Sequence, residues 1–354
     1  MEIFNPAHCQ SLRGHRSDSS SDTPEAILPT VGGVARSVDF FAEDLRRRGH
    51  DVLVVAPSFS ETAEAEPHIL RVPAIQNFNA SDFSVRIPVP FLIDQEIDAF
   101  EPDLIHSHHP FLLGDAALRA ARRRKPPLLF TYHTQYEKYT HYVPLDSESL
   151  KRFVINLATG YANLCSSVVA PSRSIARIIQ RRGVETPVAV ISTGVDVDFF
   201  SKGDGDTFRL DRDISREAFV VGTCSRLAPE KNLVYLSRAA AGYLKTDPDA
   251  RFLVLGEGPS EKEFSKEIET FQKSGEMAAQ WRIEVRRTAK ELSRDNCARQ
   301  MEALYQSVLA SDLTVGDEGE DDLISWAKLL EGIKAEWELL TEKTTAAVKS
   351  LQTE

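Results

Sequence analysis

The sequence has no run of 18 consecutive apolar residues, and no basic segment followed by an apolar one opens it, so we expect neither a membrane-spanning helix nor a secretory leader. Cysteine is scarce. The four cysteines stand far apart without a CxxC pair, which argues against a zinc knuckle or a disulfide scaffold and favours the reducing cytoplasm. Basic residues are outnumbered, with 42 Lys and Arg against 53 Asp and Glu. The formal net charge of −11 excludes a general nucleic-acid binder, which needs a basic surface.

The 354-residue chain does contain short apolar runs, separated by stretches with helical periodicity. The runs are continuous rather than alternating, which is typical of parallel strands buried on both faces. They occur at Val52–Ala56, Ile69–Ile75, Leu104–Ile105, Leu128–Tyr132, Val168–Ala170 and Val188–Ile191. A second pattern of this kind has its apolar runs at 219–224 and 252–255. The predicted fold class is α/β with two Rossmann-like, doubly wound domains.

Changes in composition predict the domain boundaries. Polar, turn-rich residues predict a flexible arm over 1–28, and a charged stretch predicts a linker over 201–217. Between them we place the first domain, 29–200. A partial second domain over 218–310 and a helical tail over 311–354 follow the linker. The second domain is predicted to be incomplete, because only two strands are visible where a doubly wound sheet normally has more.

Two glycines, Gly32 and Gly33, stand just before the first predicted helix. Glycine lets the backbone come close to a ligand, and a helix N-terminus attracts phosphate oxygens. The pair is therefore a candidate phosphate contact, and a plain turn explains it equally well.

Histidines gather where two of the predicted strands end. His106, His108 and His109 belong to one strand end, and His133 follows the next strand. Because parallel strands place ligands at their carboxyl ends, we expect these side chains to share one crevice. A metal would need a further carboxylate or histidine at suitable spacing, and none stands out, so we favour a sugar or phosphate pocket. Buried capping roles are the alternative for one or two of the four.

The loop after the first strand of the second domain carries Arg226 and Lys231. Two cations in a strand-to-helix loop suit a diphosphate and would stabilise the negative charge of a departing one. An exposed salt-bridging pair is the alternative. The next strand ends in a turn that contains Glu257 and Gly258. This turn lacks the GxGxxG fingerprint, and a tight turn is as good an explanation as a nucleotide contact.

These motifs, in this order, resemble the retaining glycosyltransferases of family 4, whose two Rossmann-like domains form the GT-B fold. The matching stretches are PTVGGVARSV (29–38), EPDLIHSHHPFLLG (101–114), LLFTYHTQYEKYTHYVP (128–144), VVAPSRSI (168–175), VISTGVDVDFF (190–200), GTCSRLAPEKN (222–232) and FLVLGEGP (252–259). The stretch at 128–144 looks most like the branch that glucosylates diacylglycerol.

The resemblance implies a role for each candidate residue. His133 would be the catalytic contact to the transferred sugar, and Arg226 and Lys231 would hold the donor diphosphate. His109 would lie on the acceptor side.

For the remaining candidates the resemblance implies contacts to the nucleotide part of the donor. Gly32 and Gly33 would approach the diphosphate through their amides, and Glu257 and Gly258 would lie near the base and ribose. The co-substrate implied is a nucleotide-diphosphate sugar, with no metal and no further cofactor.

One family feature has no credible counterpart. Family members carry two glutamates separated by seven residues in a Phe- and Gly-rich context. The pairs Glu261/Glu269 and Glu276/Glu284 have the spacing without that context, so we reject both. The chain therefore resembles a donor domain from which about a hundred residues are missing, compared with a domain of ordinary size.

The leading hypothesis is transfer of a hexose, with retention, from a nucleotide-diphosphate sugar to an acceptor, either a sugar or a lipid such as diacylglycerol. The first alternative is a catalytically inactive relative that binds sugar, lipid or a partner. A metal-dependent hydrolase using His106, His108 and His133 is a further alternative.

Two basic segments suggest a peripheral position on the inner face of an anionic membrane. One is the run 119–125, and the other comprises Arg177, Arg181 and Arg182 on a helix with isoleucines on its other face. Ordinary solvated helix faces are the alternative interpretation.

Overall fold

A computed structural model of the chain describes residues 2–5, 33–57, 68–72, 74–75, 85–86, 90–111, 113–138, 140, 148–225, 227–228, 231–244, 247, 249–258 and 291–311. The chain forms two compact units. The first contains residues 1–194 and 294–354, and the second contains residues 195–293.

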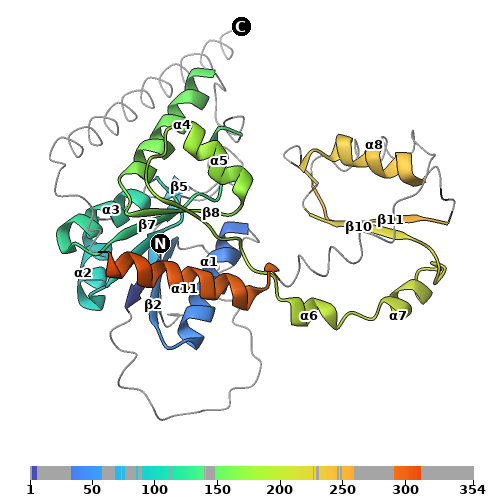
Figure 1. Ribbon diagram of the computed structural model, residues 1–354, viewed down its shortest axis with the longest axis horizontal. Coiled ribbons are helices and arrows are strands. Elements are labelled where there is room, and N and C mark those ends of the chain that lie inside the picture. The colour runs from blue at the N-terminus through green and yellow to red at the C-terminus, as the bar shows by residue number, and fades with distance from the viewer. Residues whose placement is uncertain are drawn as a thin grey trace, which may run out of the picture. The chain divides into compact units, whose positions relative to one another are not determined.

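A seven-stranded sheet forms the centre of the first unit (Figure 1). Its strands, in spatial order, are β3 (Ile69–Val72), β2 (Asp51–Pro57), β1 (Glu2–Asn5), β6 (Leu104–Ser107), β7 (Leu128–Thr131), β8 (Ser167–Ala170) and β9 (Val188–Val190). Strand β2 pairs with β3 in parallel, and β6 to β9 form a continuous parallel series. Strand β1 alone in this sheet is antiparallel to both of its neighbours.

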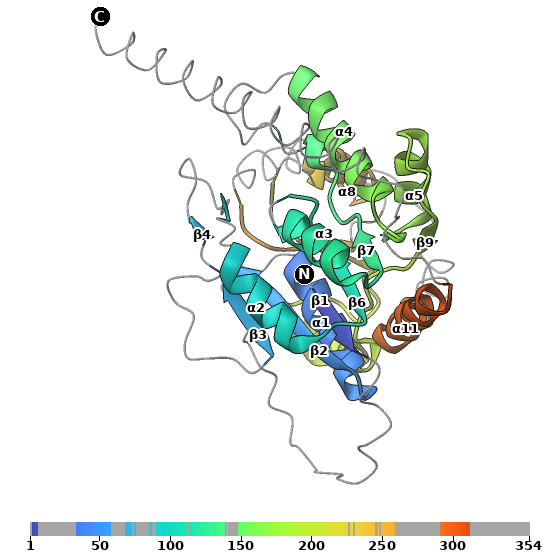
Figure 2. The ribbon, with the colours of Figure 1, turned by 90° about the vertical axis from the view of Figure 1, so that its left-hand side faces the viewer.

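Helices cover both faces of this sheet (Figure 1 and Figure 2). They are α1 (Gly33–Arg47), α2 (Pro90–Phe100), α3 (Leu113–Arg124), α4 (Glu148–Asn163), α5 (Arg173–Arg181) and α11 (Arg294–Ala310). Both faces of the sheet need helices because neighbouring residues of a strand bury their side chains on opposite faces. Ile105 packs in one apolar cluster and its neighbour Leu104 in another, and Leu128 and Leu129 divide in the same way. The doubly wound α/β layout predicted for this unit is therefore confirmed.

Three minor elements are also found among the described residues of the first unit. Strands β4 (Ala74–Ile75) and β5 (Val85–Arg86) pair antiparallel, and the 3-10 turn η3 (Tyr136–Lys138) follows β7. Gly49 ends α1 with φ of 92°, which is the backbone conformation that favours glycine after a helix.

The second unit contains α6 (Val197–Ser201), α7 (Gly205–Leu210), β10 (Val220–Cys224), α8 (Leu233–Leu244) and β11 (Arg251–Leu255). Strands β10 and β11 are parallel neighbours, and α8 connects them along the chain. These are the two strands that the sequence predicted for the second domain. In neither unit is a described helix long and apolar enough to cross a membrane.

The structure divides the chain differently from the predicted domains. Residues 294–310, which we assigned to the second domain, form α11 of the first unit. The reason is burial: Cys297, Met301 and Tyr305 are almost inaccessible to solvent and pack in the cluster that contains α1. The first unit's leading segment ends at Gly194 rather than residue 200, and part of the predicted linker is helical.

The predicted arm over 1–28 also differs in part. Its residues Glu2–Asn5 form an interior strand of the sheet, because their backbone bonds to β2 on one side and β6 on the other. Most of the predicted tail, from residue 312 onward, lies outside the described residues.

Candidate functional site

The histidines lie together at one edge of the sheet, as predicted. His106 is the third residue of β6, and His108 and His109 follow that strand. His133 comes two residues after the end of β7, which pairs in parallel with β6. Two neighbouring parallel strands that end at the same edge therefore bring these histidines near one another.

His106 is completely buried and is held at both ring nitrogens. Its Nδ1 lies 2.6 Å from the hydroxyl of Tyr305, and its Nε2 lies 2.7 Å from the hydroxyl of Thr131. A neutral imidazole donates with one nitrogen and accepts with the other, so this environment suits the uncharged ring. Burial also lowers the pKa of His106 well below its usual value.

His108 connects His106 to His133. Its ring centroid is 4.2 Å from that of His106, and its Nδ1 lies 2.9 Å from Nε2 of His133. Burial lowers the pKa of His108 well below its usual value, and it lowers the pKa of His133 to about 4. The cluster is therefore neutral at neutral pH, which suits hydrogen bonding to sugar hydroxyls rather than charge pairing with phosphate.

Metal ligation by the same histidines finds little support in this geometry. Nowhere in the described part of the chain do three or more His, Cys, Asp or Glu residues form a group able to hold a metal ion. His106 already uses both nitrogens on hydroxyl groups.

His109 points into an aromatic cluster. Its ring meets Phe111 edge to face at 5.1 Å and Tyr136 at 5.3 Å. Its carbonyl accepts a hydrogen bond from Ser107 and lies so close to Gly114 that a β-carbon there would overlap it. Gly114 was not singled out from the sequence, where it is only the last residue of the stretch 101–114.

The segment that carries His133 is fixed by an ion pair. Arg182 donates to Glu137 at 2.7 Å, and its other terminal nitrogen lies 3.4 Å from the Tyr132 hydroxyl. Only 8% of the Glu137 side chain is exposed. Arg182 was predicted to belong to a basic, membrane-facing surface, but it is engaged with this carboxylate instead.

The donor-side candidates of the first unit are described only in part. Gly33 opens α1, is exposed, and has no atom within 4 Å of the place where a β-carbon would stand. The first turn of α1 carries no acidic residue that would repel an anion. Gly32 lies outside the described residues.

The second unit brings its candidate loops together at the carboxyl ends of β10 and β11. Ser225 donates its amide to Leu255 at 3.0 Å, and Leu227 donates to the carbonyl of Glu257 at 2.8 Å. A β-carbon on Gly258 would overlap the Leu227 carbonyl. Close backbone packing is therefore sufficient to explain this glycine.

The charged candidates of the second unit are Lys231 and Glu257, and both are exposed. The Lys231 amide bonds back to Ala228 at 3.0 Å, so the residue sits in a tight turn just before α8. Arg226 and both rejected glutamate pairs lie outside the described residues.

The histidine edge and every strand of the seven-stranded sheet except β1 belong to a segment that matches a known family. Residues 31–199 match the sequence profile of Glycosyltransferase Family 4. The resemblance to this family is confirmed. An alpha-monoglucosyldiacylglycerol synthase of Acholeplasma laidlawii is 28% identical over 262 residues, which are 70% of this chain and 65% of that protein. A GDP-mannose-dependent alpha-mannosyltransferase of Corynebacterium glutamicum is 31% identical over 247 residues, 67% of this chain and 57% of that protein.

Solved structures give a weaker similarity. Anabaena HepE in complex with UDP has a TM-score of 0.47 and 20% identity, covering 69% of this chain and 65% of that one. The chain thus spans between about half and two thirds of the length of these curated relatives and of HepE.

Proposed function

We propose that this protein transfers a hexose from a nucleotide-diphosphate sugar to a lipid acceptor such as diacylglycerol, with retention of the anomeric configuration. The observation that carries the proposal is the neutral, hydrogen-bonded histidine cluster at the ligand-binding edge of the family 4 segment. The names of the relatives support the two substrate classes. The proposal includes no cofactor beyond the sugar donor.

The direct test is an assay with UDP-glucose and GDP-mannose as donors and diacylglycerol in vesicles as acceptor. We expect a glycolipid product whose anomeric carbon, examined by NMR, keeps the donor's configuration. Binding of a donor without any product would instead support the alternative, a ligand-binding relative that does not catalyse transfer. The second unit favours this non-catalytic alternative, because its described residues contain only two strands.

Within this proposal, Lys231 holds the donor diphosphate. Lys231→Ala is expected to weaken binding of UDP about tenfold and to leave binding of uridine nearly unchanged, because an ammonium group interacts with the diphosphate and not with the nucleoside. Isothermal titration with both ligands measures this difference. Lys202→Ala, which removes another exposed lysine of the same unit, is the matched control. Equal weakening of UDP and uridine by Lys231→Ala would contradict the role.

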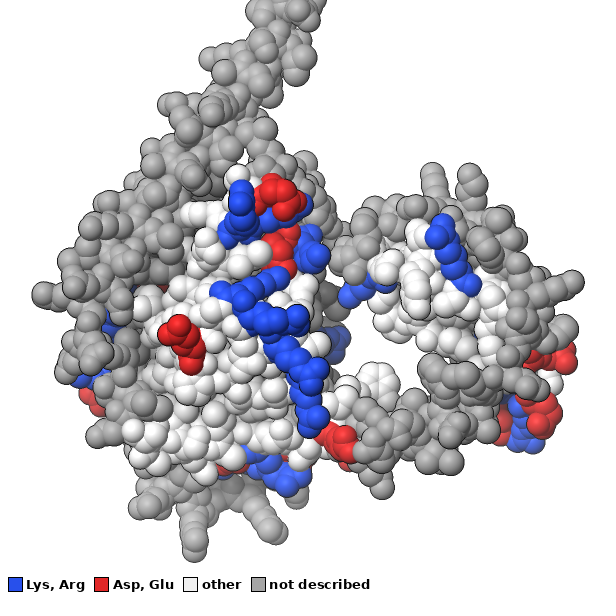
Figure 3. Space-filling view, turned by 45° about the horizontal axis from the view of Figure 1, so that its top comes forward, with Lys and Arg blue, Asp and Glu red and all other residues white. Residues whose placement is uncertain are grey.

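We further propose that the protein works as a cytoplasmic, peripheral protein on an anionic membrane surface. Figure 3 shows a band of Lys and Arg side chains on one face of the molecule. Helix α5 carries Arg173, Arg177 and Arg181, all exposed and four residues apart. No ion pair to a described acidic residue is found for these three arginines. The basic run of α3 differs, because Arg119, Arg123 and Arg124 pair with Asp115, Asp94 and Asp98.

This contrast gives a prediction with a matched control. Changing the three α5 arginines to glutamine is expected to weaken binding to phosphatidylglycerol vesicles about a hundredfold, at about 1 kcal/mol for each cation. Changing the three paired arginines of α3 removes the same charge and is expected to have a much smaller effect. Vesicle sedimentation at low salt measures both. Equal losses would show that net charge alone governs binding, and no binding by the unaltered protein would overturn the membrane proposal.

A further inference from the structure

We propose that His108 is a positioning residue that determines which ring nitrogen of His133 carries the proton. The consequence for catalysis rests on the proposed function, but the assignment itself concerns only the ground-state protein. Neither the family profile nor any relative's name assigns a role to His108.

The argument begins with the bond between the two rings. Nδ1 of His108 and Nε2 of His133 lie 2.9 Å apart, so one nitrogen donates and the other accepts. Both rings are neutral at neutral pH, because burial lowers both pKa values. Each ring therefore has one N–H, and only one proton lies between them.

Because only one proton lies between the two rings, the tautomer of one ring determines the tautomer of the other. If His108 donates from Nδ1, then Nε2 of His133 is bare and the His133 proton is on Nδ1. If His133 donates from Nε2, then Nδ1 of His108 is bare and the His108 proton is on Nε2. In both cases the two rings adopt the same tautomer, so a tautomer that is fixed at His108 also fixes the tautomer of His133.

His108 can determine the tautomer of the pair because its ring is held in place by His106. Its ring stacks on His106, tilted by 32°. His106 in turn is bound at both nitrogens by Tyr305 of α11 and Thr131 of β7. Only 4% of His108 is exposed, so solvent offers it no competing partner of the kind that would randomise the proton.

The tautomer decides whether Nδ1 of His133 carries a proton, and this nitrogen is the one that can still contact a ligand. Across the described residues, no hydrogen bond to Nδ1 of His133 is found, and the residue keeps some exposure at the edge of the sheet. When Nδ1 carries the proton, it donates to a sugar oxygen. When it is bare, it accepts from a sugar hydroxyl. His108 thus selects the polarity of the contact between His133 and the donor sugar.

NMR of ¹⁵N-histidine-labelled full-length protein tests the proposal at pH 7 without any need for activity. The ring nitrogens of His133 and His108 are assigned from the variants His133→Gln and His108→Asn, and the exposed His68→Gln serves as a control that should leave both rings unchanged. We expect one tautomer for each ring, and the same tautomer for both. Opposite tautomers at the two rings, or a mixture of tautomers at His133, would overturn the proposal in the unaltered protein.

A second comparison separates positioning from packing. His108→Leu fills the space but cannot hydrogen bond, so we expect loss of the single tautomer at His133. His108→Asn keeps a polar group near the position of Nδ1, so we expect the bond to His133 and much of the tautomer preference to return. An unchanged single tautomer in His108→Leu would show that another group fixes His133. If His133 has one tautomer but no donor is turned over, the positioning role stands and the proposed function fails.

Discussion

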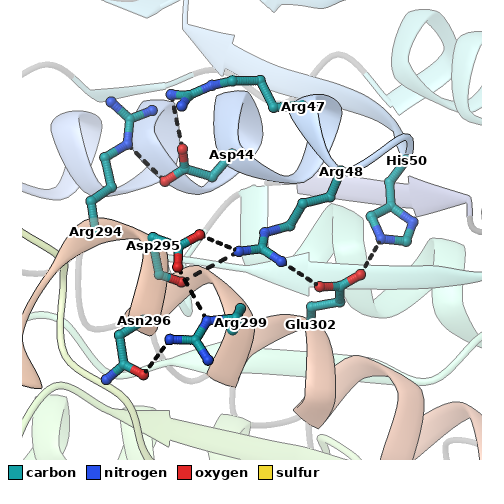
Figure 4. Close-up of polar contacts among 9 residues, drawn as sticks. All are labelled: Asp44, Arg47, Arg48, His50, Arg294, Asp295, Asn296, Arg299 and Glu302. Atoms are coloured by element: carbon teal, nitrogen blue, oxygen red, sulfur yellow. Dashed lines mark hydrogen bonds and ion pairs between the residues drawn. The ribbon is translucent and has the colours of Figure 1, made fainter.

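Replacing Arg294 with alanine is expected to lower the free energy of unfolding of the first unit by about 3 kcal/mol. Arg294 donates to Asp44 at 2.7 Å (Figure 4). It also donates to Glu43 at 2.5 Å, and its guanidinium group lies 4.4 Å from the centre of the Phe40 ring. The Asp44 side chain is only 8% exposed, so its charge needs a partner. The expected loss is at the low end for a broken buried pair because Arg47 still contacts Asp44 at 2.9 Å.

Urea unfolding followed by circular dichroism measures the loss, and hydrogen exchange at the amides of α1 shows whether it is local. The control lies on the same helix. Arg299 pairs with Asp295 at 3.2 Å, but both side chains are mostly exposed, so Arg299→Ala is expected to change the free energy of unfolding by about 0.5 kcal/mol at most. Similar small effects for both variants would mean that the ion pairs of Arg294 contribute little to holding α11 in the first unit.

Mild acid is expected to destabilise the first unit through its histidine cluster. An unfolded histidine has a pKa of about 6.5, whereas burial lowers the pKa of folded His133 to about 4 and those of His106 and His108 well below the usual value. Below about pH 6.5 the unfolded chain therefore binds protons that the folded chain does not. Each such histidine lowers the free energy of unfolding by up to about 1.4 kcal/mol per pH unit as the pH falls. For His133 alone, the loss between about pH 6.5 and 4 is about 3 kcal/mol.

Urea unfolding at a series of pH values between 7 and 4 measures this dependence. His133→Gln removes one titrating group and is expected to make the slope less steep by about 1.4 kcal/mol per pH unit. The same substitution at the exposed His68, His68→Gln, is the matched control. The prediction fails if His133→Gln and the unaltered protein lose stability in parallel as the pH falls.

The sheet and its histidine edge were predictable because both depend on local patterns. Continuous apolar runs predicted the strands. Because the carboxyl ends of parallel strands lie at the same edge of a sheet, His106 and His133 were expected to lie near one another. The partner of His106 was not predictable in this way. Tyr305 is 199 residues further along the chain, and its helix has no feature in sequence that marks it as part of the first unit.

Two other features show where sequence patterns are insufficient. Arg182 belongs to a basic segment of the sequence, yet in the folded chain it forms an ion pair with the buried carboxylate of Glu137. Strand β1 has four residues, too few for periodicity to be recognised, and its place in the sheet comes entirely from backbone bonds to segments about 50 and 100 residues away.

The return of α11 to the first unit has a consequence for how the protein is made. During synthesis, the segment up to Gly194 is complete before the second unit appears, but the helix that covers Phe41 and Leu45 of α1 emerges only after it. At about 5–20 residues per second, a ribosome takes about 5–20 s to synthesise the intervening hundred or so residues. For that interval the nascent first unit presents an uncovered apolar face, which is the type of surface that holdase chaperones bind. The second unit is thus translated while the core of the first is still incomplete.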